Sequence, residues 1–282
     1  MQLETFSEPL TKGQFAYERL AQLQSDISNC ENKNVSILID LEDKRTGLPF
    51  IFLLACMPYY ANSVGKNLEM MVDNKTFTLM RRLRVPGVRE GGKETFAGKT
   101  GFHSLTSQEE VVILANSILE KFPVATSDEL RGEIELNIGE IFNNAHEHSN
   151  AKSIFGSWFT KKRGIYCFVC YDTGVGIPEK VNRFIEENGY KRVSDIAALK
   201  WAMRRGNSTS SRNNPGLGLD LLREFVSLNK GAMRICTGNV LYYLNKDGEK
   251  HIPLSKKFSG TIFEMDIIPD SKTYRFKREV EQ

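Results

Sequence analysis

One long amphipathic segment, residues 127–149, constrains the fold of this chain more than any other. It opens with Ser127, Asp128 and Glu129, an N-cap residue followed by the acidic first turn that favours a helix start. At about 100° per residue, one face is apolar and carries Ile134, Ile138, Ile141, Phe142 and Ala145. An adjacent face is polar and carries Glu133, Asn137, Glu140, Asn144 and His148. The segment therefore predicts a long helix that packs on a core along one side and presents polar groups on another.

The region after this helix alternates strands and helices, and we expect residues 127–282 to form one domain. The predicted strands and helices are 153–160 and 165–171, then 193–205 and 217–228. Lys161-Lys162-Arg163-Gly164 is the expected hairpin turn between the two strands. The remaining residues predict further strands, divided by turns at Asp247-Gly248 and Ser259-Gly260.

The N-terminal region predicts a small α/β domain over residues 1–100. The expected elements are a strand over 35–41, a helix from Pro49 to about Met57, a strand over 67–72 and a helix over 75–83. This β-α-β-α order is typical of α/β proteins.

Residues 101–126 are expected to connect the two domains. A stretch rich in glycine and charge, 86–94, precedes them and predicts a loop or linker. Within the connection, a helix should begin near Ser107, continue to about Phe122 and end at Pro123.

Composition argues against several classes of protein. A net charge of +3 over 282 residues is nearly balanced, so a dominant nucleic-acid footprint is not indicated. The most apolar stretch, 48–60, has 13 residues and two prolines, short of the roughly 18 that suggest a membrane span. Among the five cysteines, the close pair Cys167 and Cys170 falls within a predicted strand and has no second CxxC. With no apolar leader at its start, the sequence predicts a cytoplasmic protein.

Glu140 and Asn144 lie four residues apart on the polar face of the long helix, and are therefore neighbours. An amide oxygen and a carboxylate so placed can share one magnesium site, with Asn144 as a ligand and Glu140 holding a water. Magnesium binds few protein ligands and keeps several waters, which leaves room for phosphates. Because a solvated polar face explains the same spacing, this pair matters only in combination with other motifs.

A second motif, Asp172-Thr173-Gly174-Val175-Gly176-Ile177-Pro178, directly follows a predicted apolar strand. A carboxylate at a strand end can accept a hydrogen bond from an adenine amino group. The two glycines let the backbone turn sharply and approach a ligand closely. An ordinary Asp-x-Gly turn is the competing interpretation.

The third motif is a polar loop that ends in Gly216-Leu217-Gly218-Leu219 and leads into a helix. Phosphates bind at such helix starts, because free N–H groups and the helix dipole favour anions. Ser208, Thr209 and Arg212 suit a lid that orders over phosphates. The loop lacks the Gly-Lys-Ser/Thr of a P-loop and the preceding strand of a dinucleotide fold. A plain glycine-rich turn is the alternative.

Taken in order, the motifs form one pattern: Glu140-x-x-x-Asn144, Asp172-x-Gly174-x-Gly176, Gly216-x-Gly218-Leu219 and Gly260-Thr261. This pattern resembles the GHKL superfamily of ATP-binding proteins, which includes gyrases, heat-shock chaperones, histidine kinases and mismatch-repair proteins. The resemblance covers about residues 130–269, roughly half the chain. It implies a two-layer α/β sandwich with a mixed sheet, helices on one face, and ATP bound between the helices and a lid.

The resemblance also implies a role for each matching residue. Asn144 would bind magnesium, and Glu140 would polarise the attacking water or hydroxyl. The adenine side would comprise Asp172, Gly174, Gly176, Ile177 and Thr261. The phosphate side would comprise Ser208, Thr209, Arg212, Gly216, Leu217, Gly218 and Leu219.

Within the superfamily, the sequence looks most similar to anti-sigma-factor serine kinases, whose ATP domain has an Asn-Ala-x-x-His ending like that of residues 144–148. A sensor histidine kinase needs a phosphoacceptor histidine on a helical hairpin, whereas His103 is expected in a loop. The strand and helix of the N-terminal region resemble the STAS-type domains that such serine kinases phosphorylate. The Asp-Ser expected at the start of that helix is missing, and the chain has Thr46-Gly47-Leu48-Pro49 there instead. Thr46 is therefore a candidate phosphosite by position alone, and a plain scaffold domain is the alternative.

We expect a signalling protein that binds Mg-ATP and acts as a slow ATPase or a serine/threonine protein kinase. An ATP-gated protein-binding switch without turnover is the main alternative, and a nucleic-acid-associated ATPase is the third. A protein partner or substrate is expected, a homodimer is left open, and a membrane partner is not expected. The short basic clusters at 81–84 and 161–163 predict solvated faces rather than nucleic-acid contacts.

Overall fold

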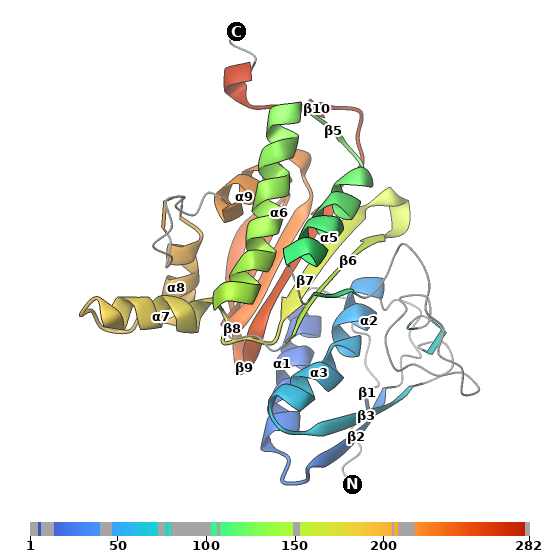
Figure 1. Ribbon diagram of the computed structural model, residues 1–282, viewed down its shortest axis with the longest axis vertical. Coiled ribbons are helices and arrows are strands. Elements are labelled where there is room, and N and C mark those ends of the chain that lie inside the picture. Colours follow the sequence, from blue (N-terminus) through green and yellow to red (C-terminus); the bar gives the residue numbers. More distant parts are fainter. Residues whose placement is uncertain are drawn as a thin grey trace.

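A five-stranded sheet lies at the centre of the structure (Figure 1). The computed structural model describes residues 5–6, 14–39, 47–72, 77–78, 80, 103–105, 108–148, 153–204, 206–207 and 218–279. The strands of the sheet follow the order β4-β6-β7-β9-β8. Their bounds are His103–Leu105 for β4, Ile154–Thr160 for β6, Tyr166–Asp172 for β7, Gly248–Ile267 for β9 and Ala232–Asn245 for β8. His103, expected in a loop, therefore begins a short edge strand.

Every pairing between the described strands of this sheet is antiparallel, so the predicted mixed sheet is wrong. The cause is the connection that follows β7. After β7 the chain passes through helices and returns as β8, which is not adjacent to β7 in the sheet. The next strand, β9, forms a tight hairpin with β8 and lies between β8 and β7. A parallel neighbour would require the helical crossover to end beside β7 itself.

One face of the sheet is covered by the three helices α5, α6 and α9, which are Gln108–Glu120, Asp128–His148 and Gly218–Asn229. The predicted apolar face of α6 is buried against this side, where Ile134, Ile138 and Phe142 have no exposed surface. Two further helices, α7 at Ile177–Glu187 and α8 at Asp195–Ala202, project to one side of the sheet (Figure 1). The α8 helix was expected, whereas α7 was not.

Two of the three predicted turns are confirmed. The β6–β7 loop turns at Arg163 and Gly164, which have φ values of 65° and 73°, and β8 and β9 form a hairpin closed by the pair Asn245 and Gly248. The third expected turn, at Ser259-Gly260, is wrong because β9 continues through it. The irregularity is a bulge: Thr237 pairs with Thr261 but Gly238 pairs with Phe258, so residues 259–260 are additional residues on β9.

The N-terminal region contains a three-stranded parallel sheet in the order β1-β2-β3. Its strands are Thr5–Phe6, Asn34–Ile39 and Asn67–Val72, and its helices are α1 Gln14–Asn29, α2 Leu48–Ala55 and α3 Met57–Ser63. The strands predicted near 35–41 and at 67–72 are thus present. The helix predicted from Pro49 ends at Ala55, because Pro58 starts a new helix. Of the helix predicted over 75–83, only 77–78 and 80 are described; the 86–94 linker and Thr46 lie outside the described residues.

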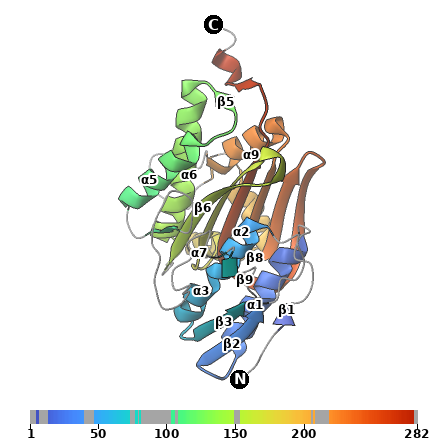
Figure 2. The same cartoon turned by 90° about the vertical axis from the view of Figure 1, so that its right-hand side faces the viewer.

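The N-terminal helices cover the second face of the five-stranded sheet (Figure 2). Leu20, Leu23 and Ile27 of α1 are buried in one cluster with Tyr171 and Phe258 from β7 and β9. The two-layer arrangement expected for the C-terminal domain therefore gains a further layer, because the N-terminal helices lie on the second face. Apolar side chains on both faces of β7 need cover, and α1 and α2 supply it.

Two short strands complete the fold: β5 at Ala125–Thr126 pairs in parallel with β10 at Thr273–Tyr274. Short 3-10 helices occupy Lys162–Gly164 and Lys277–Glu279. Among the described residues, no helix is both long enough and apolar enough to span a membrane.

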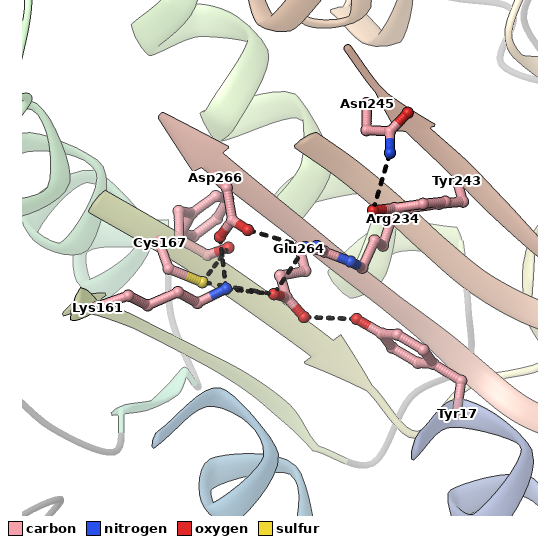
Figure 3. A network of polar contacts seen from close by, with 9 residues as sticks. Tyr17, Lys161, Cys167, Arg234, Tyr243, Asn245, Glu264 and Asp266 are labelled. Carbon is pink, nitrogen blue, oxygen red and sulfur yellow. Dashed lines mark hydrogen bonds and ion pairs between the residues drawn. The ribbon is translucent and has the colours of Figure 1, made fainter. Parts of the chain in front are cut away.

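A buried ionic network ties α1 to the sheet near the start of β7 (Figure 3). Glu264 and Asp266 of β9 both contact Lys161 and Arg234, and the Tyr17 hydroxyl of α1 donates to Glu264 Oε2 at 2.5 Å. Burial alone would raise the pKa of Glu264, but Arg234 and Lys161 lower it to about 2. The carboxylate is therefore ionised and fully partnered, as a buried charge requires.

Tyr17→Phe tests how much this contact contributes to holding α1 on the sheet. We expect the free energy of unfolding in urea to fall by about 1–2 kcal/mol, because one oxygen of a buried carboxylate loses its donor. Tyr243→Phe is the control, since its hydroxyl accepts only a 3.3 Å bond from Asn245, and a change within about 0.5 kcal/mol is expected there. Equal effects in the two variants would show that the Tyr17 contact is unimportant.

Candidate functional site

Asp172 is a buried carboxylic acid at the end of β7, with 5% of its surface exposed. Its Oδ1 accepts a hydrogen bond from Gly174 N at 2.8 Å, and Thr261 stands opposite it in β9. Burial raises the pKa of Asp172 to about 7, although hydrogen bonds from Gly174 and Thr261 act in the opposite direction. Within the described part of the chain no cation contributes to this pKa, and the group lies near the midpoint of its titration at neutral pH.

The turn after Asp172 is held by Thr237, a fully buried residue of β8. Thr237 Oγ1 accepts a hydrogen bond from Ile177 N and donates to Gly260 O, both at 3.0 Å. Gly176 has a φ of 83°, and a Cβ there would lie 2.6 Å from Thr237 Oγ1. Glycine is therefore required at this position for both conformational and steric reasons.

Gly260 is restricted in the same way from the other side of the site. Its φ is 86°, and a Cβ there would overlap the carbonyl oxygen of Asp172. The bulge of β9 thus presses bare backbone against the end of β7. As a result, the structure brings together the five residues predicted for the adenine side, Asp172, Gly174, Gly176, Ile177 and Thr261; their binding role stays a prediction.

Glu140 and Asn144 occupy the C-terminal half of α6, which lies beside the start of α7 in both overall views (Figures 1 and 2). Glu140 is half-buried and Asn144 is exposed. Burial raises the pKa of Glu140, while the nearby ammonium group of Lys180 on α7 opposes the rise. Lys180 and Glu140 therefore bring charged groups of opposite sign to the same edge of the structure.

The phosphate-side residues predicted from the sequence are largely outside the described part of the chain. This applies to Ser208, Thr209, Arg212, Gly216 and Leu217. Gly218 begins α9, and Leu219 is partly buried against the core below α6 and α9. Before the loop, α8 is fixed by Asp195, whose carboxylate accepts a 2.7 Å hydrogen bond from Asn239 N beside the β8 bulge.

Two residues at the site carry no strong sequence signal. Thr237 lies in an ordinary β-rich stretch, and only the bulge reveals that its hydroxyl links the Gly176 turn to Gly260. Lys180 belongs to α7, which was not predicted, so its position beside Glu140 could not be inferred. Pro178 in the first turn of α7 is the sequence signal that indicates a helix there, and with it the position of Lys180 on a helix.

Two groups of described residues offer atoms that could hold a metal ion or a polar ligand. Asn144 and Glu140 offer hard oxygen atoms, the ligand type that magnesium prefers, and Asp172 offers a buried acceptor for an amino group. Another potential metal-binding group, Cys167, Glu264 and Asp266, has its ligand atoms within 4.8 Å of one another. Lys161 and Arg234 already neutralise its carboxylates, so it serves as an ionic network.

No protein family matches this sequence, and no curated protein does. Among solved structures, the chain is similar to the histidine kinase domain of a blue-light activated histidine kinase from Erythrobacter litoralis EL346. The sequence identity is 17% and the TM-score is 0.26, over 90% of this chain and 94% of that one. With so low a TM-score, nothing about activity follows from the likeness.

Asp172→Asn tests the buried acid without any ligand. Between about pH 4 and pH 7, the unfolded chain ionises Asp172 while the folded chain keeps its proton, so the stability of the wild type falls as pH rises. The full shift corresponds to about 4 kcal/mol at most. We expect Asp172→Asn to be about 2 kcal/mol more stable than the wild type at pH 8, and this gain to vanish near pH 4, in urea unfolding followed by circular dichroism.

Glu264→Gln is the matched control, because the fold lowers the pKa of Glu264 whereas it raises the pKa of Asp172. The pKa of Glu264 is lowered to about 2, so its ionised form stabilises the fold above pH 4.5 and stops doing so as pH falls through 2. This variant should therefore lose stability at pH 8, where Asp172→Asn gains it. If Asp172→Asn is no more stable than the wild type at pH 8, the folded chain ionises Asp172 with no free-energy penalty relative to the unfolded chain, and its pKa is not raised.

Proposed function

We propose that this chain binds Mg-ATP beside Asp172 and transfers or hydrolyses its γ-phosphate slowly in a signalling role. The observation that carries the proposal is the buried Asp172 carboxyl, which lies against glycine backbone and which no cation of the described residues compensates. An uncompensated buried acid costs stability, and perturbed acids of this kind are concentrated at functional sites. The GHKL-like order of the sequence motifs supports the same proposal.

Asp172 and Thr261 would form the adenine side of the site. The ionised carboxylate of Asp172 accepts a hydrogen bond from the adenine amino group more strongly than the neutral acid does. Gly176 and Gly260 keep side chains out of this region, so a flat base can approach the backbone. Because the pKa of Asp172 is about 7, nucleotide affinity should increase as pH rises from 6 to 8.

Glu140, Asn144 and Lys180 would form the phosphate side of the site. Asn144 would hold magnesium through its amide oxygen, and bound magnesium would offset the charge that develops on the phosphates. Burial raises the pKa of Glu140, which makes it a better base for the proton of an attacking hydroxyl. Lys180 beside it would attract the phosphates electrostatically. Roles for Ser208, Thr209, Arg212, Gly216, Leu217, Gly218 and Leu219 in phosphate binding remain predictions.

The reaction would be an attack by a water or a protein hydroxyl on the γ-phosphorus. Glu140 takes the proton of the nucleophile, the new oxygen–phosphorus bond forms, the bond to the β-phosphate oxygen breaks, and ADP leaves. With water the outcome is ATP hydrolysis, and with a serine or threonine hydroxyl it is phosphorylation of a protein partner. The N-terminal α/β region, with its STAS-like order of elements, is proposed as the part that engages this partner.

Calorimetric titration of the full chain with ATP tests the binding site. The wild type should bind ATP only when magnesium is present, and its affinity should rise about tenfold between pH 6 and pH 8. Asp172→Asn should bind at least about tenfold more weakly than the wild type at pH 8, because the amide cannot supply a charged acceptor. Wild-type affinity in Asp172→Asn would remove Asp172 from the site.

Glu140→Gln and Asn144→Ala separate catalysis from binding. Glu140→Gln should retain ATP affinity but release phosphate about 100-fold more slowly, because the general base is lost. Asn144→Ala should lose magnesium-dependent binding itself. Glu133→Gln, two turns earlier on the same face of α6, is the matched control and should behave as the wild type does.

An ATP-gated protein-binding switch is distinguished by the same Glu140→Gln variant. A switch needs bound nucleotide but no turnover, so the wild type would then bind Mg-ATP without measurable phosphate release. Glu140→Gln would keep the same partner affinity in the presence of ATP. A loss of partner phosphorylation in Glu140→Gln would instead identify a kinase.

A further inference from the structure

Helix α1 reaches the candidate site through one buried side chain, Gln24, of which 1% is exposed. Gln24 Oε1 accepts a hydrogen bond from Ser259 N at 2.7 Å. Gln24 Nε2 donates to Ser259 O at 3.1 Å and to the Tyr171 hydroxyl at 2.9 Å. The side-chain amide thus makes the pair of backbone hydrogen bonds that a neighbouring strand would make.

Ser259 needs such a partner because it lies in the bulge of β9. The β8 strand pairs Thr237 with Thr261 and Gly238 with Phe258, so it offers Ser259 no partner. The β7 strand offers none either, because its pairing with β9 ends at Asp172 and Thr261. An unpaired buried backbone group is costly, so Gln24 both stabilises the bulge and fixes the orientation of the peptide groups at Ser259.

The residues that directly follow Ser259 are those that contact Asp172. The Gly260 carbonyl oxygen accepts a hydrogen bond from the Thr237 hydroxyl, and the Gly260 backbone packs against the Asp172 carbonyl. Thr261 provides hydrogen bonds to the Asp172 carboxyl. Gly260 and Thr261 directly follow Ser259 in the chain. A rotation of the Ser259 peptide would therefore displace the contacts of both residues together.

We propose that Gln24 is a positioning residue of the nucleotide site, which holds Gly260 and Thr261 where Asp172 needs them to bind adenine. The inference rests on the proposed function and deepens it: through Gln24, the N-terminal region sets the nucleotide affinity of the C-terminal site. Gln24 itself does not touch the nucleotide. It acts through the backbone of β9.

Glu18 supplies a matched comparison on the same helix and the same strand. Its Oε1 accepts a 2.8 Å hydrogen bond from Ser255 N, which is four residues before the bulge contact. Loss of this contact removes a link between α1 and β9 but leaves Ser259 held. A difference between Gln24 and Glu18 variants therefore reports on the bulge and not on the general attachment of α1.

The experiment is calorimetric titration with ATP and magnesium chloride between pH 6 and pH 8.5, on the full-length wild type, Gln24→Leu, Gln24→Glu and Glu18→Leu. We expect Gln24→Leu to bind about tenfold more weakly, and Glu18→Leu to bind as the wild type does. Gln24→Glu keeps the acceptor for Ser259 N and loses the donor, so its affinity should lie between the two. Circular dichroism establishes which variants fold. If Gln24→Leu does not fold, the affinity of Gln24→Glu tests the role of Gln24 instead.

The pH profile gives a readout that a merely structural role would not change. Hydrogen bonds from Thr261 lower the pKa of Asp172, so a displaced Thr261 should move the midpoint of binding to higher pH by about half a unit. The titratable neighbours Cys170 and Tyr171 do not interfere, because burial raises the pKa of each well above its usual value.

The possible results separate the inference from the function on which it rests. Folded Gln24 variants with wild-type affinity and an unchanged midpoint overturn the role of Gln24 while ATP binding stands. Equal weakening in Glu18→Leu and Gln24→Leu also overturns it, because the effect would then follow from loosening α1. If the wild type and Glu18→Leu bind no ATP at any pH, the proposed function fails and this inference fails with it.

Discussion

The close approach of the Gly260 backbone to the end of β7 is the constraint on which the candidate site depends. A side chain at Gly260 would overlap the Asp172 carbonyl, and one at Gly176 would meet Thr237. The bulge of β9, the turn after β7 and the Thr237 hydroxyl therefore form one interlocked unit. This unit brings glycine backbone, with no side chain, against the end of β7 where Asp172 is buried.

Two buried carboxyl groups on adjacent strands have pKa values shifted in opposite directions. Glu264 receives two cations and the Tyr17 hydroxyl, and its pKa falls to about 2. From the residues that the structure describes, Asp172 receives hydrogen bonds and no cation, and its pKa rises to about 7. The first arrangement stabilises the fold at neutral pH, whereas the second costs stability there. Among the described residues, cations compensate the cost of burial at Glu264 but not at Asp172, and this difference supports the proposed binding role of Asp172.

Local patterns predicted most of the elements, while long-range pairing was not predictable. The periodicity of α6 correctly indicated its buried apolar face. The spacing of the motif at Asp172 indicated a tight turn after the strand, and Gly174 N does donate to Asp172 Oδ1. Antiparallel pairing throughout the sheet depends on where the chain returns after α8, which no local pattern records. The Ser259-Gly260 dipeptide resembles a turn, yet it forms a bulge because β8 continues beside it on both sides. Gln24 could not be assigned a role, because its partner lies 235 residues away.

The need for helices on the second face of the sheet follows from the sequence of β7. All seven residues of β7 are buried, and the run lacks the alternation of a strand with one solvated face. Such a strand requires a layer on each side, so the chain must supply helices for the second face. Once α1 occupies that face, its polar side chains meet the backbone of β9, and the bulge takes Gln24 as its hydrogen-bonding partner. Covering an apolar face and contacting the site are thus two consequences of a single packing requirement.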